Sequence, residues 1–102
     1  MRVIARKRLR GFVRQYPDAA ETLENWYRAF RAAKWTSLQE VRRVFPHADS
    51  VMVASGNSVT VFNIGGNKYR LIVAIHYNRQ RVFILRFLRH AEYSKGLWRK
   101  GL

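Results

Sequence analysis

Cationic and proton-transferring side chains gather in two stretches in the second half of the chain. Lys68 and Arg70 lie in the first stretch, and Arg89, His90 and Tyr93 lie in the second. Arginine and lysine hold phosphate oxygens, whereas histidine and tyrosine donate or accept protons. Cleavage of an RNA phosphodiester needs both kinds of group, because the 2′-hydroxyl loses a proton, the phosphorane gains negative charge and the departing 5′-oxygen gains a proton. These residue types therefore favour phosphodiester cleavage as the chemistry of the site.

The carboxylates do not gather beside these residues. Asp49 and Glu92 are isolated in the sequence, and the three acidic residues Asp18, Glu21 and Glu24 lie around the second expected helix. A two-metal nuclease needs a carboxylate cluster, so that class is disfavoured. The chain also has no cysteine, which excludes a disulfide framework and a Cys-based zinc site. We expect neither a metal ion nor another cofactor.

The first half of the chain has the pattern of helices. Apolar residues recur at helical spacing over 9–16, 23–30 and 38–44, and Pro17 and Pro46 end the first and third segments. Two of the helices follow the spacing of a capping box, in which a short polar residue precedes Glu by three positions: Asp18 with Glu21, and Ser37 with Glu40.

The second half has the pattern of strands. Segments rich in β-branched and aromatic residues are separated by Gly or Asn clusters: 50–54, 59–64, 69–77 and 82–88. Residues 3–5 are a possible short extra strand, and residues 90–100 are either a short helix or an extended tail. We therefore expect an α+β fold, with N-terminal helices packed on a mainly antiparallel four-stranded sheet.

Two expected hairpins would bring the cationic residues together. A two-residue turn at Gly65-Gly66 would place Lys68 near Arg70, and continued register in the next hairpin would place Arg89 opposite Arg70. His90 and Tyr93 follow directly on the chain. A slip of one residue in this register would separate the group.

The other parity of the strands is apolar and suits a face covered by the helices. Its members are Phe62, Ile64, Tyr69, Leu71, Val73, Ile75 and Tyr77, with Arg86 as the charged exception. Val61, Ile72 and Ala74 on the first face also need cover, from the terminal segment or a partner chain. We expect Trp98 to lie on the sheet there.

The charge balance points to a polyanionic partner. Twenty Lys and Arg residues and six Asp and Glu residues give a formal charge of +14. Self-repulsion of this size is tolerated where an opposite charge is supplied, and the excess of Arg over Lys favours phosphate, so nucleic acid is the first candidate. No apolar run resembles a signal peptide or a membrane span, and we expect a cytoplasmic protein with no membrane association.

Two segments resemble the HigB toxins of bacterial toxin–antitoxin pairs, which belong to the RelE-like superfamily. They are Val61–Ile72, VFNIGGNKYRLI, and Leu88–Lys95, LRHAEYSK. The combination of Gly-Gly-Asn-x-x-Arg with a distal His-x-Glu-Tyr is its most specific part. Tyr16-Pro17, Phe45-Pro46 and the Trp26 helix extend the resemblance over nearly the whole chain.

The resemblance implies one toxin domain over residues 1–102 with a microbial RNase fold. It also implies a metal-independent endoribonuclease, an mRNA interferase that cleaves mRNA on the translating ribosome and so inhibits translation and growth. The expected products are a 2′,3′-cyclic phosphate and a 5′-hydroxyl. The expected partners are mRNA, the ribosome with its rRNA, and a HigA-like antitoxin with a helix-turn-helix domain.

The resemblance also implies roles for individual residues. Arg70 matches the strand arginine that stabilises transition-state charge, and His90 and Tyr93 fall in the motif that supplies proton-transfer groups. The candidate RNA-phosphate ligands are Lys68, Arg89 and Lys95. The chain departs from the family at Ser94, where relatives often have Asp. Which of His90 and Tyr93 is the base stays open.

Two other classes stay open beside this reading. A non-catalytic RNA-binding or ribosome-associated protein would need only the basic excess, and it would have no cleavage to lose when Arg70 is replaced. A DNA-binding regulator is disfavoured, because the sheet-rich second half shows no helix-turn-helix pattern.

Overall fold

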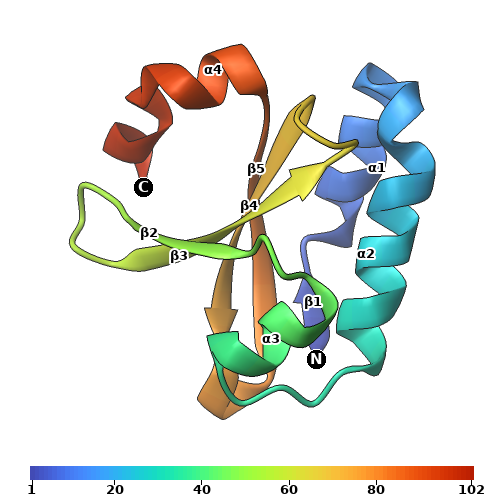
Figure 1. Ribbon diagram of the computed structural model, residues 1–102, viewed down its shortest axis with the longest axis vertical. Coiled ribbons are helices and arrows are strands. Elements are labelled where there is room, and N and C mark those ends of the chain that lie inside the picture. Colours follow the sequence, from blue (N-terminus) through green and yellow to red (C-terminus); the bar gives the residue numbers. More distant parts are fainter.

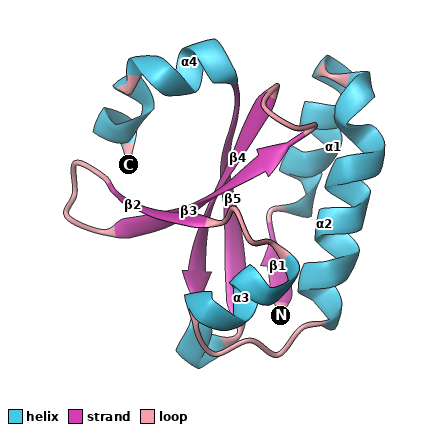
Figure 2. Cartoon of the chain, in the orientation of Figure 1, coloured by secondary structure: helices cyan, strands magenta, loops and turns pink.

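The computed structural model describes residues 1–102 and contains a helical layer, a five-stranded sheet and a helical C-terminal segment (Figure 1). The strands lie between the α1–α2 pair and α4 (Figure 2). The helical elements are α1 (Arg6–Gln15), the 3-10 helix η1 (Pro17–Ala19), α2 (Ala20–Ala32), α3 (Leu38–Val44), the 3-10 helix η2 (Tyr77–Arg79), α4 (His90–Lys95) and the 3-10 helix η3 (Leu97–Gly101). None of the helices has both the length and the apolar character needed to span a membrane.

The sheet has the spatial order β1-β5-β4-β3-β2. Its strands are β1 (Arg2–Ile4), β2 (Asp49–Met52), β3 (Ser58–Ile64), β4 (Tyr69–His76) and β5 (Arg81–Arg89). β1 pairs in parallel with β5, and every other neighbouring pair is antiparallel. The predicted α+β class and the mainly antiparallel sheet are confirmed, and the possible N-terminal strand is its fifth member.

The main core lies between the helices and the sheet and contains a cluster of aromatic rings among aliphatic side chains. Trp26 and Phe30 lie one turn apart on α2 and stack with ring centres 4.3 Å apart. The ring of Phe62 on β3 meets that of Phe30 edge to face, at 5.4 Å and 90°. Such pairs add about 0.5–1.5 kcal/mol each beyond the burial of their area. The predicted apolar face is confirmed as the face that the helices cover.

The second face of the sheet is covered by the C-terminal segment. Trp98 of η3 packs with Val59, Val61 and Ile72, all of which are buried. The segment is helical and bends at Gly96, whose φ of 73° ends α4 in the left-handed region that glycine favours. The expectation that Trp98 lies on the sheet is confirmed.

The turn between β3 and β4 is longer than the two residues expected. Tyr69, not Asn67, pairs with Ile64, so the turn contains four residues, 65–68. The expected register is therefore wrong by two positions, which leaves every side chain on the face assigned to it. Lys68 stays outside the ladder as a result.

The register between β4 and β5 also differs from the expected one. Val82 pairs with Ile75 and not with Tyr77, so the hairpin begins two positions from the expected register. A β-bulge between Ile72 and Val73 then shifts the pairing by one, so that Arg70 pairs with Leu88 and Arg89 pairs with Tyr69. A bulge adds one residue to one strand and so exchanges the two faces of the residues beyond it. The predicted pairing of Arg70 with Arg89 is therefore wrong.

The same bulge moves Arg86 away from the helix-covered face. Arg86 pairs with Ile72, a residue of the second face, and its guanidinium lies beside Gly101 of η3. The prediction that Arg86 interrupts the apolar face is wrong. The helix-covered face contains Phe87 and Ile84 from β5, both in the main core.

One of the two predicted capping boxes forms only in part, and the other does not form. The Glu40 N–H donates to the Ser37 hydroxyl at 3.4 Å, as expected at the start of α3. The Glu40 carboxylate, however, accepts from the Thr36 N–H at 2.9 Å and not from Ser37. Asp18 lies in η1, and α2 has no side-chain cap. The Asp18 carboxylate binds one residue of the β3–β4 turn, Lys68, and one residue of β4, Tyr69, as described below.

Candidate active site

Arg70 is a buried cation at the start of β4, only 9% exposed. Its Nη1 donates to the carbonyl oxygen of Tyr69 at 3.1 Å, and its Nη2 donates to Asn67 Oδ1 at 3.4 Å. None of the four ion pairs in the chain includes Arg70. A buried guanidinium without a counter-ion loses hydration that two carbonyl contacts restore only in part. The position is therefore suited to receive an anion.

Tyr93 on α4 lies next to Arg70, and Trp98 holds it in place by a ring stack and a hydrogen bond. The Cζ atom of Arg70 is 5.6 Å from the centre of the Tyr93 ring. The Tyr93 and Trp98 rings stack at 5.3 Å and 19°, and the Trp98 indole N–H donates to the Tyr93 carbonyl oxygen at 3.1 Å. The half-buried Tyr93 makes no hydrogen bond through its hydroxyl within the chain, so this group is available to a substrate.

His90 is the first residue of α4, and its backbone is anchored to the turn before Arg70. The His90 N–H donates to the Lys68 carbonyl oxygen at 2.9 Å. The His90 side chain is exposed, and it lies three residues before Tyr93, a spacing that places both on one side of a helix. The structure thus brings Arg70, Tyr93 and the start of α4 to one end of the sheet.

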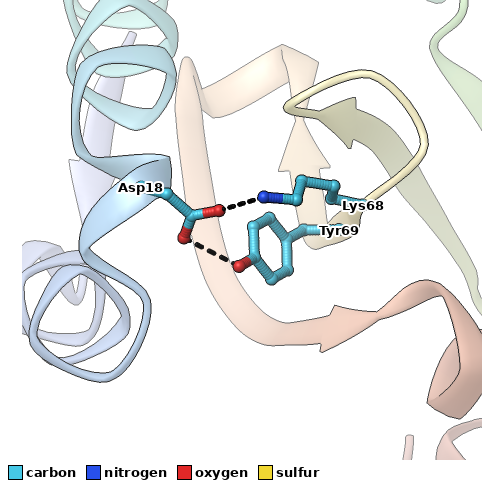
Figure 3. A network of polar contacts seen from close by, with 3 residues as sticks. All are labelled: Asp18, Lys68 and Tyr69. Atoms are coloured by element: carbon cyan, nitrogen blue, oxygen red, sulfur yellow. Dashed lines mark hydrogen bonds and ion pairs between the residues drawn. The ribbon is translucent and has the colours of Figure 1, made fainter.

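The ammonium group of Lys68 is turned toward the helical layer, where it meets Asp18 (Figure 3). Lys68 Nζ lies 2.6 Å from Asp18 Oδ2, and the Tyr69 hydroxyl donates to Asp18 Oδ1 at 2.8 Å. The hydrogen bond from Lys68 is the main cause that lowers the pKa of Asp18, and the same bond raises the pKa of Lys68. The expected convergence of Lys68 with Arg70 is therefore not what the structure shows.

The other two candidate phosphate ligands lie on or beside α4. Arg89 Nε donates to Glu92 Oε1 at 3.2 Å, and this bond raises the pKa of Arg89. Lys95 is exposed and lines a hollow of about 260 Å³ together with Leu88, Glu92, Leu97 and Trp98. Arg89 is thus partly neutralised, whereas Lys95 has no ion-pair partner.

Two residues that the sequence analysis did not assign to the site support it. The Asn67 side chain accepts a hydrogen bond from Arg70. The Asp18 carboxylate binds the side chains of Lys68 and Tyr69, the two residues that precede Arg70. The signal for Asn67 is its place in the turn three residues before Arg70. No local signal exists for Asp18, since its partners lie 50 and 51 positions away in the sequence.

The carboxylates of the chain are not arranged to hold a metal ion beside Arg70. No three His, Asp or Glu side chains form a possible metal-binding group. Four of the six acidic residues are in ion pairs: Asp18 with Lys68, Glu24 with Arg28, Asp49 with Arg42 and Glu92 with Arg89. The groups that remain for chemistry at this end of the sheet are a guanidinium, a phenol and an imidazole.

Helices on a mainly antiparallel sheet, with a strand arginine beside a C-terminal tyrosine, are consistent with the class of RelE-like toxins. The family model described as HigB toxin, the RelE-like toxic component of a toxin–antitoxin system, matches residues 19–96. The chain belongs to this HigB toxin family. It is 30% identical over 95 residues to the mRNA interferase HigB of Escherichia coli O6:H1, covering 93% of this chain and 90% of the relative. It is 25% identical over 94 residues to the mRNA interferase toxin HigB of Escherichia coli K12, covering 92% and 88% of the two chains.

Proposed function

We propose that this HigB-family toxin is an endoribonuclease that cleaves mRNA without a metal ion. The observation that carries the proposal is the Arg70 guanidinium, which is buried, lacks a carboxylate partner and lies against Tyr93. An anion bound there would replace the missing counter-charge. Two relatives that match more than nine-tenths of the chain are named mRNA interferases, which agrees with an RNA phosphate as that anion.

The proposed reaction uses the substrate's own 2′-hydroxyl as the nucleophile. One of His90 and Tyr93 takes the 2′-hydroxyl proton, the 2′-oxygen bonds to phosphorus, and the bond to the 5′-oxygen breaks. The other residue gives its proton to the departing 5′-oxygen, so the products are a 2′,3′-cyclic phosphate and a 5′-hydroxyl. Proton transfer of this kind contributes about 10²- to 10⁴-fold in rate. A donor aimed at the developing charge, the role of Arg70, contributes about 10²- to 10³-fold.

The proposed phosphate ligands differ in how readily they can act. Lys95 has no competing carboxylate, so it can meet an adjacent phosphate directly. Lys68 and Arg89 must leave Asp18 and Glu92 or bind phosphate as part of those pairs. Exposed ion pairs contribute only about 0–1 kcal/mol, so a phosphate of the RNA backbone can displace them.

The proposed setting is the cytoplasm, with the translating ribosome and its rRNA as the place of cleavage and a HigA-like helix-turn-helix protein as the antitoxin. The charge of +14 supports a large RNA surface as a partner, since counter-ion release favours such binding. Family membership supports an antitoxin.

Induced expression in a bacterium tests the proposed function. The wild type should stop growth and create new 5′-hydroxyl ends inside coding regions, whereas Arg70→Ala should do neither at an equal level of soluble protein. Arg79→Ala is the matched control, because Arg79 is an exposed arginine in η2 outside the site. If the wild type changes neither growth nor mRNA ends, the nuclease assignment is wrong.

A further inference from the structure

A groove of about 500 Å³ lies between α1 and α2, away from the residues proposed for cleavage. Its floor is apolar and consists of Leu9 and Val13 from α1 with Ala20, Leu23 and Tyr27 from α2. Leu9 and Leu23 belong to the main core, so the floor is the outer surface of a well-packed layer. The groove is therefore a stable feature of the helical pair.

The rim of this groove is cationic. Arg6, Arg10 and Arg14 line it from α1, a helix that contains no acidic residue. None of the three is in an ion pair, although the Arg6 guanidinium covers the Tyr27 ring at 4.2 Å. Glu24 is the acidic residue of the lining, and it is paired with Arg28 at 3.2 Å. An apolar floor beneath unpaired arginines fits a ligand with an apolar face and acidic edges.

We propose that this groove docks an acidic amphipathic helix of the antitoxin. An amphipathic helix presents apolar residues at three- and four-residue spacing on one side and can carry Asp or Glu beside them. The apolar side would cover the half-buried Val13 and Ala20, over the base that Leu9 and Leu23 close, and the carboxylates would meet Arg10 and Arg14 in two-pronged contacts. α1 has ten residues, about 15 Å at 1.5 Å per residue, so two to three turns of a partner helix would fill the groove.

Two other occupants fit the groove less well. RNA offers phosphates to the arginines but gains little from an apolar floor, and the Tyr27 face on which a base could stack is covered by Arg6. A second copy of the chain would bring a further +14 charge and an identical basic rim against the first. Charge complementarity therefore favours an acidic protein segment.

The groove and the proposed cleavage site lie on different sides of the sheet. α1 and α2 cover one face, while α4, which carries Tyr93, lies on the other side (Figure 2). The inference adds a docking surface to the antitoxin partnership proposed above. Its readout is binding and not cleavage, so its failure is distinguishable from failure of the nuclease assignment.

The test is titration calorimetry of the full-length toxin with the full-length antitoxin encoded beside it. The double variant Arg10→Glu/Arg14→Glu reverses the charge of the rim, and Val13→Lys places a charge on the apolar floor. Arg43→Glu/Arg79→Glu is the matched control, because it makes the same change in net charge at exposed positions outside the groove. Each variant is first checked for wild-type circular dichroism and cooperative melting.

The two groove variants should raise Kd by about tenfold or more, equivalent to about 1.4 kcal/mol, while the control pair stays within about threefold of the wild type. Substituting Glu or Asp of the antitoxin helix by Lys should restore binding to the reversed rim. Equal weakening by both pairs of reversals, or no weakening by either groove variant, overturns the proposal. Two other outcomes for the groove variants would also overturn the proposal. Loss of RNA binding with unchanged antitoxin binding would assign the groove to RNA, and loss of a toxin dimer in sedimentation with unchanged antitoxin binding would assign it to a second copy of the chain.

Discussion

The guanidinium of Arg70 and the ring of Tyr93 meet across two elements, with the Arg70 Cζ atom 5.6 Å from the ring centre. Arg70 comes from the sheet, and Tyr93 comes from α4, which Trp98 fastens to the sheet by stacking on that same ring. The contact therefore exists only when the C-terminal segment is docked. Any change that loosens Trp98 is expected to separate the two residues as well.

Replacing Arg70 by Met should separate activity from stability. The loss of the guanidinium should reduce cleavage by at least about 10²- to 10³-fold. The unfolding free energy should stay the same or rise by about 1 kcal/mol, because a buried cation without a counter-ion is replaced by an apolar side chain of similar length. Denaturant melting and single-turnover cleavage measure the two effects. A fall in stability as large as that of a core truncation would contradict this account.

Replacing Tyr93 by Phe should lower the rate without loosening α4. The ring that stacks on Trp98 remains, and the hydroxyl makes no hydrogen bond within the chain, so stability should change by less than about 0.5 kcal/mol. The cleavage rate should fall by about 10²-fold or more if the hydroxyl moves a proton. Tyr93→Ala is the contrast, since it removes the stacking partner of Trp98 together with the hydroxyl. An unchanged rate for Tyr93→Phe would leave His90 as the proton-transfer group to test.

The Asp18 carboxylate should stabilise the fold in a pH-dependent way. Its pKa is lowered in the folded state by Lys68, so the stabilisation is present above the unfolded pKa of about 3.9 and is lost as the pH falls through the folded pKa. The difference in Tm between the wild type and Asp18→Asn should therefore be present at pH 6 and shrink below about pH 4. Glu21→Asn is the control, since Glu21 is an exposed acidic residue of α2 that forms no ion pair. A difference in Tm that is constant with pH would exclude the ion pair as its cause.

The substrate's 2′-hydroxyl should be indispensable to cleavage. An RNA with a single 2′-deoxy or 2′-O-methyl nucleotide at the scissile position should resist cleavage there, because it lacks the nucleophile, and should still be cleaved at unmodified sites. Binding should change little, since the phosphates are intact. Mapping of 5′ ends on modified and unmodified messages measures both sites. Cleavage at a 2′-deoxy nucleotide would exclude the proposed mechanism.

The sequence predicts the elements of this fold because their patterns are local. Leu23, Trp26 and Phe30 recur at helical spacing and are the buried residues of α2. Strands β2 to β5 follow β-branched and aromatic runs between turn residues, and each of these four lies within a few residues of its expected bounds. The resemblance of the two motif segments points to Arg70 and Tyr93, and in the structure the Arg70 Cζ atom lies 5.6 Å from the centre of the Tyr93 ring.

The finer geometry depends on features with no local pattern. The β4–β5 hairpin starts two positions from the expected register, and the bulge between Ile72 and Val73 shifts the pairing by one more step. The bulge thereby places Arg89 and Arg86 on the faces opposite to the expected ones. Asp18 resembles a helix cap in sequence, yet its carboxylate binds Lys68 of the β3–β4 turn and Tyr69 of β4 instead. Both outcomes depend on tertiary packing, which outweighs the small local preference for a cap.

The parallel pairing of β1 with β5 also affects when the toxin becomes complete during its own synthesis. β1 is the first strand to be made and β5 is the last, and α4 and η3 follow β5. At about 5–20 residues per second, the β1–β5 pairing and the Arg70–Tyr93 contact cannot form until about 4–20 s after synthesis of the chain begins. The pairing of two strands as far apart in the sequence as β1 and β5 slows folding further. The proposed cleavage site is therefore complete only after β5 and α4 have been synthesised, so the toxin is expected to be inactive during most of its own translation.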